Sequence, residues 1–223
     1  CDTCGCNVTP AADHHAVEVL QGLLAANDHE ASHNREHFSR HNVLAINLMS
    51  SPGAGKTSLL EATIEALDSG LRIAVIEGDL ETENDANRIR KKGVPAIQIT
   101  TGSACHLDAH MVHHALHELD LDDVDVLFIE NVGNLVCPAA FDLGEHHKVA
   151  ILSVAEGDDK PMNCPHMFAA SDPMTLSKID LLTHVDFDVG RCIEYAHRIN
   201  PDIYVLQLSA RTGEGMAAWT AWI

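Results

Sequence analysis

The segment Ser50–Thr57, which reads SSPGAGKT, constrains the fold more strongly than any other part of the chain. It follows an apolar run, Val43–Met49, that is typical of a buried strand, and Lys56–Leu67 then has the pattern of a helix. Glycines between a strand and a helix let backbone N–H groups converge on phosphate, and the helix N-terminus adds positive potential. These features predict a phosphate-binding loop, although Ser50 takes the place of the usual first glycine.

The loop also indicates how a nucleotide would be held. Lys56 is expected to reach the β- and γ-phosphates, and Thr57 is expected to ligate Mg²⁺ through its hydroxyl. Backbone amides supply further phosphate contacts. The nucleotide-binding residues predicted in this segment are Ser51, Gly53, Ala54, Gly55, Lys56, Thr57 and Ser58.

Apolar runs and helical stretches alternate along the chain after residue 42. This alternation predicts an α/β fold of the P-loop NTPase type, with a largely parallel sheet and helices on both faces. The predicted strands are Val43–Met49, Leu71–Ile76, Ala96–Thr100, Val124–Glu130, Lys148–Val154, Pro173–Leu176 and Ile203–Leu208. The predicted helices are Lys56–Leu67, Thr82–Lys92, Leu107–Leu119, Val189–Ile199 and Gly215–Ile223, with a further helix of moderate amphipathicity within residues 11–41.

Carboxylates lie at the ends of two predicted strands. Asp79 comes shortly after Leu71–Ile76, and Glu130 ends Val124–Glu130. Ligands of open α/β sheets bind at the carboxyl ends of strands. Asp79 and Glu130 are therefore candidates, beside Lys56, for the catalytic site. Each could bind Mg²⁺ or its waters, or position the attacking water, and the sequence leaves that choice open.

The stretch Ser177–Asp180 resembles the Asn-Lys-x-Asp segment with which GTPases read guanine, with Ser177 in place of Asn. Asp180 is expected to accept both N–H groups of the guanine edge, while the stem of Lys178 packs over the base. Ser209 and Ala210 follow a predicted strand and resemble the loop whose backbone amide meets guanine O6. These spacings favour GTP over ATP. The predicted GTPase domain spans residues 42–223, after a flexible N-terminal tail (1–10) and a helical, histidine-containing linker (11–41).

The tail places three thiols, Cys1, Cys4 and Cys6, within six residues. If Cys1 is the true first residue, its α-amine completes an N/S donor set that suits square-planar Ni(II) or tetrahedral Zn(II). A disulfide over so short a loop would add little stability to a flexible tail. We therefore expect the tail to bind a metal, rather than to hold a disulfide or inert cysteines.

A second metal-binding constellation is predicted around Leu107–Leu119. On a helix the histidines of this stretch would share one face, opposite an apolar face, and i,i+4 spacing can bring two imidazoles to one metal. These residues are His106, His110, His113, His114 and His117, beside Cys105. Cys137 falls in a segment expected to respond to the γ-phosphate, so nucleotide and metal could be coupled through it. The alternative is a buried, inert thiol.

Histidines also recur at every fourth position of the linker, at His29, His33, His37 and His41. On a helix they would form a gently turning stripe. We interpret the stripe as a solvated helix face rather than as a secondary cation-binding surface.

Composition narrows the classes of partner. The chain of 223 residues carries 33 Asp and Glu against 14 Lys and Arg, a formal net charge of −19. This argues against nucleic acid and anionic membranes as partners, because both require a basic face. The cysteines are few, odd in number and scattered, unlike a disulfide framework, and no apolar stretch is long enough to span a membrane. We expect a cytoplasmic protein with reduced thiols.

Six motifs occur here in one order: CxxCGC, SSPGAGKT, GDLET, CHLDAH, ENVGNLVCPAAFDLGE and SKIDLL. Together they resemble the HypB family, the nickel-insertion GTPases of [NiFe]-hydrogenase maturation. The resemblance implies a GTPase of the SIMIBI class, which also includes the signal-recognition GTPases. It implies hydrolysis of GTP to GDP and phosphate, with GTP and Mg²⁺ at the nucleotide site and Ni²⁺ or Zn²⁺ at metal sites. We expect slow intrinsic turnover, because the sequence has no obvious arginine finger and no Gln after Glu130–Gly133.

The resemblance further implies residue roles and partners. Cys1, Cys4 and Cys6 would form the tight nickel site. Cys105, His106 and Cys137 would form a nickel or zinc site in the G domain, at the interface of a nucleotide-dependent homodimer. His110 and His114 would be added ligands of that site. The implied partners are the nickel metallochaperone HypA and, as client, the hydrogenase large subunit.

Three other readings remain open at this point. The chain could be another metallocentre-assembly GTPase, such as the urease type, although the terminal thiols and the Cys105/Cys137 pair argue against it. It could be a nickel storage or sensing protein with a vestigial nucleotide site, which would hydrolyse nothing. It could also be an ATP-dependent iron–sulfur scaffold, which coloured clusters and a preference for ATP would reveal.

Overall fold

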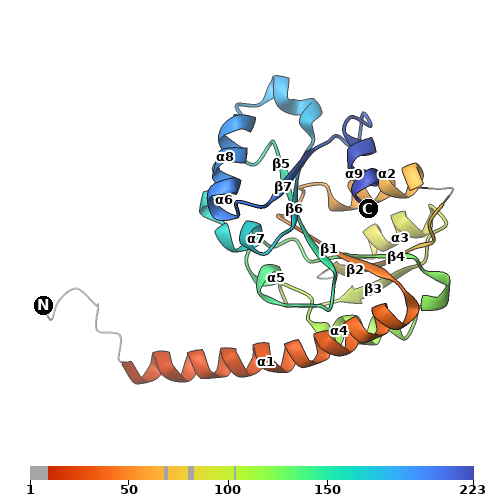
Figure 1. The fold of residues 1–223 in the computed structure, drawn as a ribbon, viewed down its shortest axis with the longest axis vertical. Helices are drawn as coiled ribbons and strands as arrows, with labels where there is room; N and C mark the ends of the chain where they lie inside the picture. Colours follow the sequence, from red (N-terminus) through yellow and green to blue (C-terminus); the bar gives the residue numbers. More distant parts are fainter. Residues whose placement is uncertain (1–9, 68–69, 80–82, 103) are drawn as a thin grey trace, which may run out of the picture.

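The computed structural model describes residues 10–67, 70–79, 83–102 and 104–223. Within them the strands form one seven-stranded sheet in the order β3-β2-β4-β1-β5-β6-β7, and every neighbouring pair is parallel. Helices cover both faces of this sheet (Figure 1). The α/β fold with a parallel sheet that the sequence predicts is confirmed.

The strands and helices have the following bounds. The strands are β1 Leu44–Ser50, β2 Ile73–Asp79, β3 Ala96–Thr100, β4 Val126–Glu130, β5 His147–Ser153, β6 Pro173–Ser177 and β7 Tyr204–Gln207. The helices are α1 Pro10–His41, α2 Lys56–Leu67, α3 Asn84–Arg90, α4 Ala109–Leu116, α5 Cys137–Ala140, α6 Lys160–Asn163, α7 Pro165–Ala169, α8 Val189–Ile199 and α9 Met216–Trp222. Two 3₁₀ turns, η1 and η2, span Leu121–Asp123 and Ile179–His184.

The alternation of side chains along the strands divides the core between the two faces of the sheet. In β4, Val126 and Phe128 pack with α2, α3 and α9, whereas Leu127 and Ile129 pack with α1 and α4. Both sets are buried, so β4 is apolar on both faces, as strands of a parallel sheet covered on two sides must be.

A third cluster continues the second face beneath β5 and β6. Ala150 and Leu152 of β5 pack there with Phe168 of α7 and with Cys192 and Ala196 of α8. All five residues are buried. Cys192 is therefore a small core residue, and its burial raises the pKa of its thiol to about 12. The thiol stays protonated and inert at neutral pH.

Helix α9 closes the first face against the helix that follows the phosphate-binding loop. Trp219 is fully buried, and its indole Nε1 donates to Thr63 Oγ1 of α2 at 2.8 Å. The rings of Trp219 and Trp222 stack, with centroids 5.3 Å apart. This contact fastens the C-terminal helix to α2.

Several predicted elements have the bounds that the sequence indicates. Helix α2, strand β3 and helix α8 begin and end at the predicted residues. Helix α4 begins at Ala109 rather than Leu107, because Asp108 caps it by accepting from the backbone N of Met111 at 2.8 Å, and it ends at Leu116 rather than Leu119. Leu107 then lies before the helix and packs into the core. The short helices α5, α6 and α7 were not predicted.

The predicted linker 11–41 is part of one continuous helix, α1. Its second half packs on α4, while its first half extends beyond the body of the domain (Figure 1). Phe38 is fully buried in the core cluster under α4, and Asn34 is fully buried too. The division into a tail, a linker and a domain stays a prediction, and Cys1, Cys4 and Cys6 lie outside the described residues.

None of the helices in the described part of the chain combines the length and hydrophobicity needed to cross a bilayer.

Candidate functional site

The phosphate-binding loop joins β1, the central strand, to α2. Gly53 and Gly55 have φ values of +76° and +105°, a conformation that residues with side chains rarely adopt. Lys56 is buried, and its Nζ donates to Ser50 Oγ at 3.0 Å. Ser50, which replaces the usual glycine, thus orients Lys56, because its hydroxyl accepts the hydrogen bond of the lysine.

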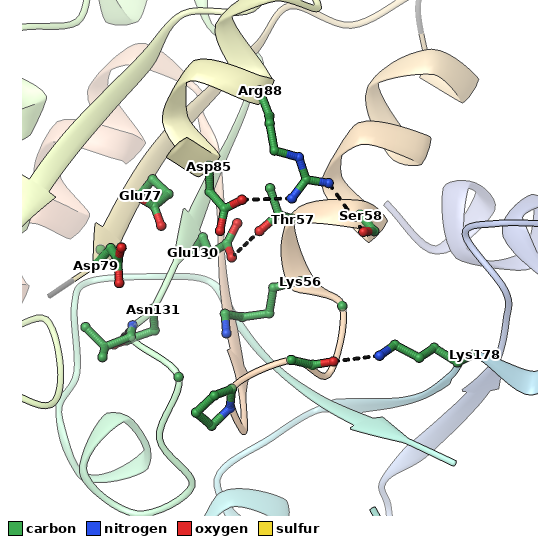
Figure 2. A pocket seen from close by; sticks show the side chains of 16 residues that line it. Lys56, Thr57, Ser58, Glu77, Asp79, Asp85, Arg88, Glu130, Asn131 and Lys178 are labelled. Atoms are coloured by element: carbon green, nitrogen blue, oxygen red, sulfur yellow. Dashed lines mark hydrogen bonds and ion pairs between the residues drawn. The ribbon is translucent and has the colours of Figure 1, made fainter. Parts of the chain in front are cut away.

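Four carboxylates, those of Glu77, Asp79, Asp85 and Glu130, line the same pocket near Thr57 (Figure 2). Thr57 Oγ1 donates to Glu130 Oε1 at 2.9 Å. Oxygens of Glu77, Asp85 and Glu130 lie within 4.8 Å of one another. Burial raises the pKa of Glu77 to about 8 and that of Glu130 to about 7.

This donor set fits a hard divalent cation. One oxygen of Glu77 and one of Glu130 are buried without a hydrogen-bond partner. Two buried carboxylates so close together are costly unless a cation or protons neutralise them. Mg²⁺ prefers carboxylate and hydroxyl oxygens, and the triphosphate would supply its other ligands. Asp79 also lines the pocket, and its charge contributes to the raised pKa of Glu77.

Three charged pocket residues, Glu77, Asp85 and Arg88, were missed by the sequence prediction, and so was Asn131. Arg88 lines the pocket and pairs with Asp85 at 2.8 Å and with Glu61 at 2.6 Å. The signal for Glu77 is the alternation of β2, which continues to Asp79 and puts Glu77 on the same face as Val75. No local pattern indicates Asp85 and Arg88, because only the packing of α3 beside α2 brings them to the pocket.

A second cavity adjoins the first, and Gly55, Ser58 and Lys178 line both. Lys178 Nζ donates to the carbonyl of Gly53 at 2.6 Å, so its stem lies along the phosphate loop. Asp180 Oδ1 accepts from Ser209 Oγ at 2.6 Å.

The predicted base-reading residues Lys178, Asp180, Ser209 and Ala210 all line this second cavity. The cavities measure about 430 and 210 Å³, within the range of small-molecule sites when taken together.

Two serines, Ser177 of β6 and Ser51 of the loop, make side-chain hydrogen bonds around the phosphate-binding loop. Ser177 is buried, and its hydroxyl donates to the carbonyl of Ala54 at 2.7 Å. Ser177 therefore anchors the loop from β6. Ser51 lines neither cavity, and its hydroxyl donates instead to Glu156. Its role in nucleotide binding stays a prediction that would act through the backbone.

The segment that follows β4 begins after Glu130 at the pocket and leads to Cys137, which belongs to a cluster of thiol and imidazole groups. Cys105 Sγ is 3.1 Å from Cys137 Sγ and 3.7 Å from His106 Nδ1. All three ligand atoms lie within 4.8 Å of one another. Thiolate and imidazole donors suit zinc and nickel. The ring of His106 packs on Phe141, with centroids 3.9 Å apart, which fixes its side of the cluster.

One buried side chain links this cluster to the nucleotide pocket. Asn131 follows Glu130 and lines the pocket, and its Oδ1 accepts from the backbone N of Leu107 at 3.1 Å. Its Nδ2 donates to Asn47 Oδ1 at 3.2 Å, which ties it to β1. The backbone of Leu107 lies two residues from Cys105, so the two sites share a hydrogen-bonded connection.

Residues 44–207 match the family described as CobW/HypB/UreG, nucleotide-binding domain. The hydrogenase maturation factor HypB of Azotobacter vinelandii is 61% identical over 207 residues, which cover 93% of this chain and 68% of that protein. The chain belongs to the HypB family. HypB of Escherichia coli K12 is 52% identical over 219 residues, covering 98% of this chain and 76% of that protein.

Solved HypB structures agree with the fold. HypB from Helicobacter pylori in complex with nickel has a TM-score of 0.85 at 39% identity, covering 88% of this chain and 93% of that one. HypB from Archaeoglobus fulgidus has a TM-score of 0.84 at 40% identity, covering 89% and 97%. The signal recognition particle receptor FtsY from Elizabethkingia anophelis, at 16% identity and a TM-score of 0.54, shares the fold alone. The predicted SIMIBI-class fold is confirmed.

The predicted histidine face next to the thiol cluster forms without His106, and the rings of His113 and His114 lie 6.5 Å apart on it. His106 precedes α4, because the cap at Asp108 starts the helix at Ala109. The other four histidines form two pairs: His110 and His114 have Nε2 atoms 3.1 Å apart, and His113 and His117 have Nε2 atoms 3.2 Å apart.

The resemblance to HypB implies that His110 and His114 are added ligands of the thiol cluster. Among the described residues they lie outside the group formed by Cys105, His106 and Cys137. Their role as ligands stays a prediction.

The linker histidines do not form a uniformly solvated face either. His37 is partly buried, and its ring lies edge-on to that of His113, with centroids 5.4 Å apart. His41 Nδ1 is 2.7 Å from Asp122 Oδ1 of η1, while His29 and His33 contact each other with centroids 4.7 Å apart. The expectation of a solvated face is wrong for His37, because α4 packs against this part of α1.

Proposed function

We propose that this HypB-family chain is a nickel-binding GTPase that couples GTP hydrolysis to nickel delivery during maturation of [NiFe]-hydrogenase. The observation that carries the proposal is the connection through Asn131, which joins an acid-lined phosphate pocket to a cysteine–histidine cluster. The names of the relatives, hydrogenase maturation factors, and the nickel complex of the Helicobacter pylori protein support it.

The nucleotide would be held between the two adjoining cavities. Lys56 and the loop amides would bind the β- and γ-phosphates, with Ser50 holding Lys56 in place before the nucleotide arrives. Asp180 would accept the N–H groups of guanine, with Lys178 and the Ser209–Ala210 loop around the base. Hydrogen-bond acceptance by a carboxylate selects the guanine edge, because adenine lacks its paired N–H donors.

Thr57, Asp79 and Glu130 are the proposed Mg²⁺ residues, with Glu77 and Asp85 beside them. A cation held by these residues would neutralise charge on the phosphate oxygens. Asp79 or Glu130 would orient the attacking water, and Lys56 would stabilise charge on the transferred phosphoryl group. Arg88 lies at the pocket but is paired with Asp85 and Glu61, so we expect slow intrinsic turnover.

Nickel or zinc would be the cargo of Cys105, His106 and Cys137. The tail thiols Cys1, Cys4 and Cys6 would form a second nickel site. Because Cys105 is exposed, we propose that the cluster is completed in a nucleotide-dependent homodimer. HypA would be the metallochaperone partner, and the hydrogenase large subunit the client.

The test is to measure Ni(II) affinity and phosphate release for four proteins: wild type, Lys56→Ala, Cys137→Ala and Cys164→Ala. We expect Lys56→Ala to lose hydrolysis by a factor on the order of 10²–10³ and to keep its metal sites. Cys137→Ala should lose the G-domain nickel site and the effect of a non-hydrolysable GTP analogue on nickel affinity. Cys164, another partly buried thiol, is the matched control and should change neither.

Two outcomes would contradict the proposal. A wild-type protein that binds nickel but hydrolyses no GTP would be a storage or sensing protein. Nickel affinity that ignores both the nucleotide and Cys137 would make the G domain independent of metal transfer.

A further inference from the structure

The interface between α1 and α4 brings imidazoles together away from the thiol cluster. His113 of α4 and His117, the C-cap residue of that helix, lie one turn apart, with their Nε2 atoms 3.2 Å apart. Two nitrogens bound to one metal through bonds of about 2.0–2.1 Å, at angles between a right angle and a tetrahedral one, are separated by roughly 2.9–3.4 Å. The pair therefore already has the spacing of two ligands of one ion.

A buried side chain of α1 fixes the orientation of His113. Asn34 is fully buried, and its Nδ2 donates to the carbonyls of Ala109 and Leu143, at 2.8 and 3.0 Å. Its Oδ1 must therefore accept, and it lies 3.0 Å from His113 Nδ1. His113 then carries its proton on Nδ1 and presents the lone pair of Nε2 to His117. A metal-binding histidine is commonly oriented in this way by a second residue.

A third imidazole comes from α1. The ring of His37 lies 5.4 Å from that of His113 and 6.1 Å from that of His117, edge-on to both. Glu30, on the same helix, is close enough for its charge to act on His113. His37 thus lies beside the pair, and its side chain would turn to bring a ring nitrogen to the same ion, with an anionic residue, Glu30, near His113.

We propose that His113 and His117 of α4, with His37 of α1, bind a borderline divalent ion such as Ni²⁺ or Zn²⁺ at the α1–α4 interface. This site is separate from Cys105 and Cys137 and needs no nucleotide. The ion would join the helix that carries the thiol tail to the domain that carries the thiol cluster. The site would hold the metal ion transiently between the thiol tail and the thiol cluster.

The test uses untagged full-length protein in which Cys1, Cys4, Cys6, Cys105 and Cys137 are serine, so that only imidazole and carboxylate sites remain. Ni(II) alone is titrated against a chromogenic chelator at fixed pH. We expect one nickel site per chain. His117→Gln and His37→Gln should each weaken it by about tenfold or more. Both side chains are at least partly exposed, so both variants should fold, which circular dichroism checks.

The chain offers two matched controls. The variant His110→Gln/His114→Gln removes the other i,i+4 pair, against which no described side chain of α1 places an imidazole ring. His184→Gln removes an exposed histidine of η2. Both should keep the nickel affinity within about twofold. A thiol-free protein that binds no nickel, or one whose binding follows His110 and His114 rather than His37 and His117, would overturn the proposal.

A second readout separates a bridge from a site on α4 alone. Nickel should slow amide hydrogen exchange in residues 27–41 of the thiol-free protein, because the ion fastens α1 to α4. The effect should be absent in His37→Gln. Equal slowing with and without His37 would show that α1 supplies no ligand.

Discussion

Asn131 Oδ1 accepts a hydrogen bond from the backbone N of Leu107 at 3.1 Å, and both residues are buried. Asn131 follows the carboxylate strand that lines the phosphate pocket, and Leu107 follows the Cys105–His106 pair. A displacement of the backbone at Glu130 by nucleotide would therefore move the metal ligands.

Asn131→Ala should uncouple the two sites. The variant leaves the buried Leu107 N–H without its acceptor, which costs about 1–3 kcal/mol of stability. We expect nickel affinity at the Cys105 site to become the same in GDP and in a non-hydrolysable GTP analogue, as measured by competitive nickel titration. Asn200→Ala also removes side-chain bonds to two backbone carbonyls, at Phe168 and Ser171, and should keep the nucleotide effect. Retained coupling in Asn131→Ala would place the connection elsewhere.

Ser177→Ala should weaken nucleotide binding. The change removes the bond that anchors the carbonyl of Ala54, worth about 0.5–1.5 kcal/mol, so the Kd for GDP should rise by about two- to tenfold. Titration with a fluorescent GDP measures it. Ser171→Ala loses an equally buried 2.7 Å bond, to the carbonyl of Met167, far from the loop, and should lose stability only. Equal Kd values for both variants would argue against an anchoring role.

Cys105 and Cys137 should form a disulfide under mild oxidation, because their sulfurs lie 3.1 Å apart. Two thiols would lose two protons and two electrons to an added diazene oxidant such as diamide, and reductant would reverse the reaction. Peptide mass spectrometry should show the intrachain link, and bound nickel should slow its formation. Cys192 should remain unlabelled by maleimide in the folded protein, since burial raises the pKa of its thiol to about 12. A disulfide between chains instead would contradict the geometry within one chain.

The Arg72–Asp125 pair should add stability that disappears in acid. Hydrogen bonds from Arg72 lower the pKa of Asp125 from 3.8 to about 2. The folded state therefore releases the proton more readily, and the contribution is complete above about pH 4 and is lost as the pH falls towards 2. Asp125→Asn should lower the urea midpoint at pH 7, and its difference from wild type should disappear only as the pH approaches 2. Asp123→Asn, at the far side of Arg72, should change little, because Asp123 is 82% exposed.

The core of the fold and the phosphate loop could be predicted because their signals are local. Gly55, Lys56 and Thr57 follow an apolar run and open a helix, and the predicted bounds of that helix match α2. The thiol cluster could be predicted only as a set of residue types. Cys105 follows β3 and Cys137 follows β4, so their approach depends on the positions of these two strands in the sheet.

Other parts of the candidate sites depend on tertiary packing, which no short sequence pattern indicates. Asp85 reaches the pocket through the tertiary position of α3, not through its neighbours in sequence. The helix start at Ala109 did have a local cue, Asp108, an amino acid favoured at N-caps. Placing the start there would have separated His106 from the helical histidines. The contact of His37 with α4 required knowing that α1 packs on that helix.

The stacking of Trp219 and Trp222 has a practical consequence. They are the only tryptophans of the sequence, and Trp219 is bonded to Thr63 on the helix that begins at Lys56. Leu107, beside the thiol cluster, packs on the opposite face of the sheet. Ultraviolet emission from this protein therefore reports on the neighbourhood of the phosphate loop. A change in that emission when metal is added would show that metal binding on one face of the sheet alters the structure on the other face.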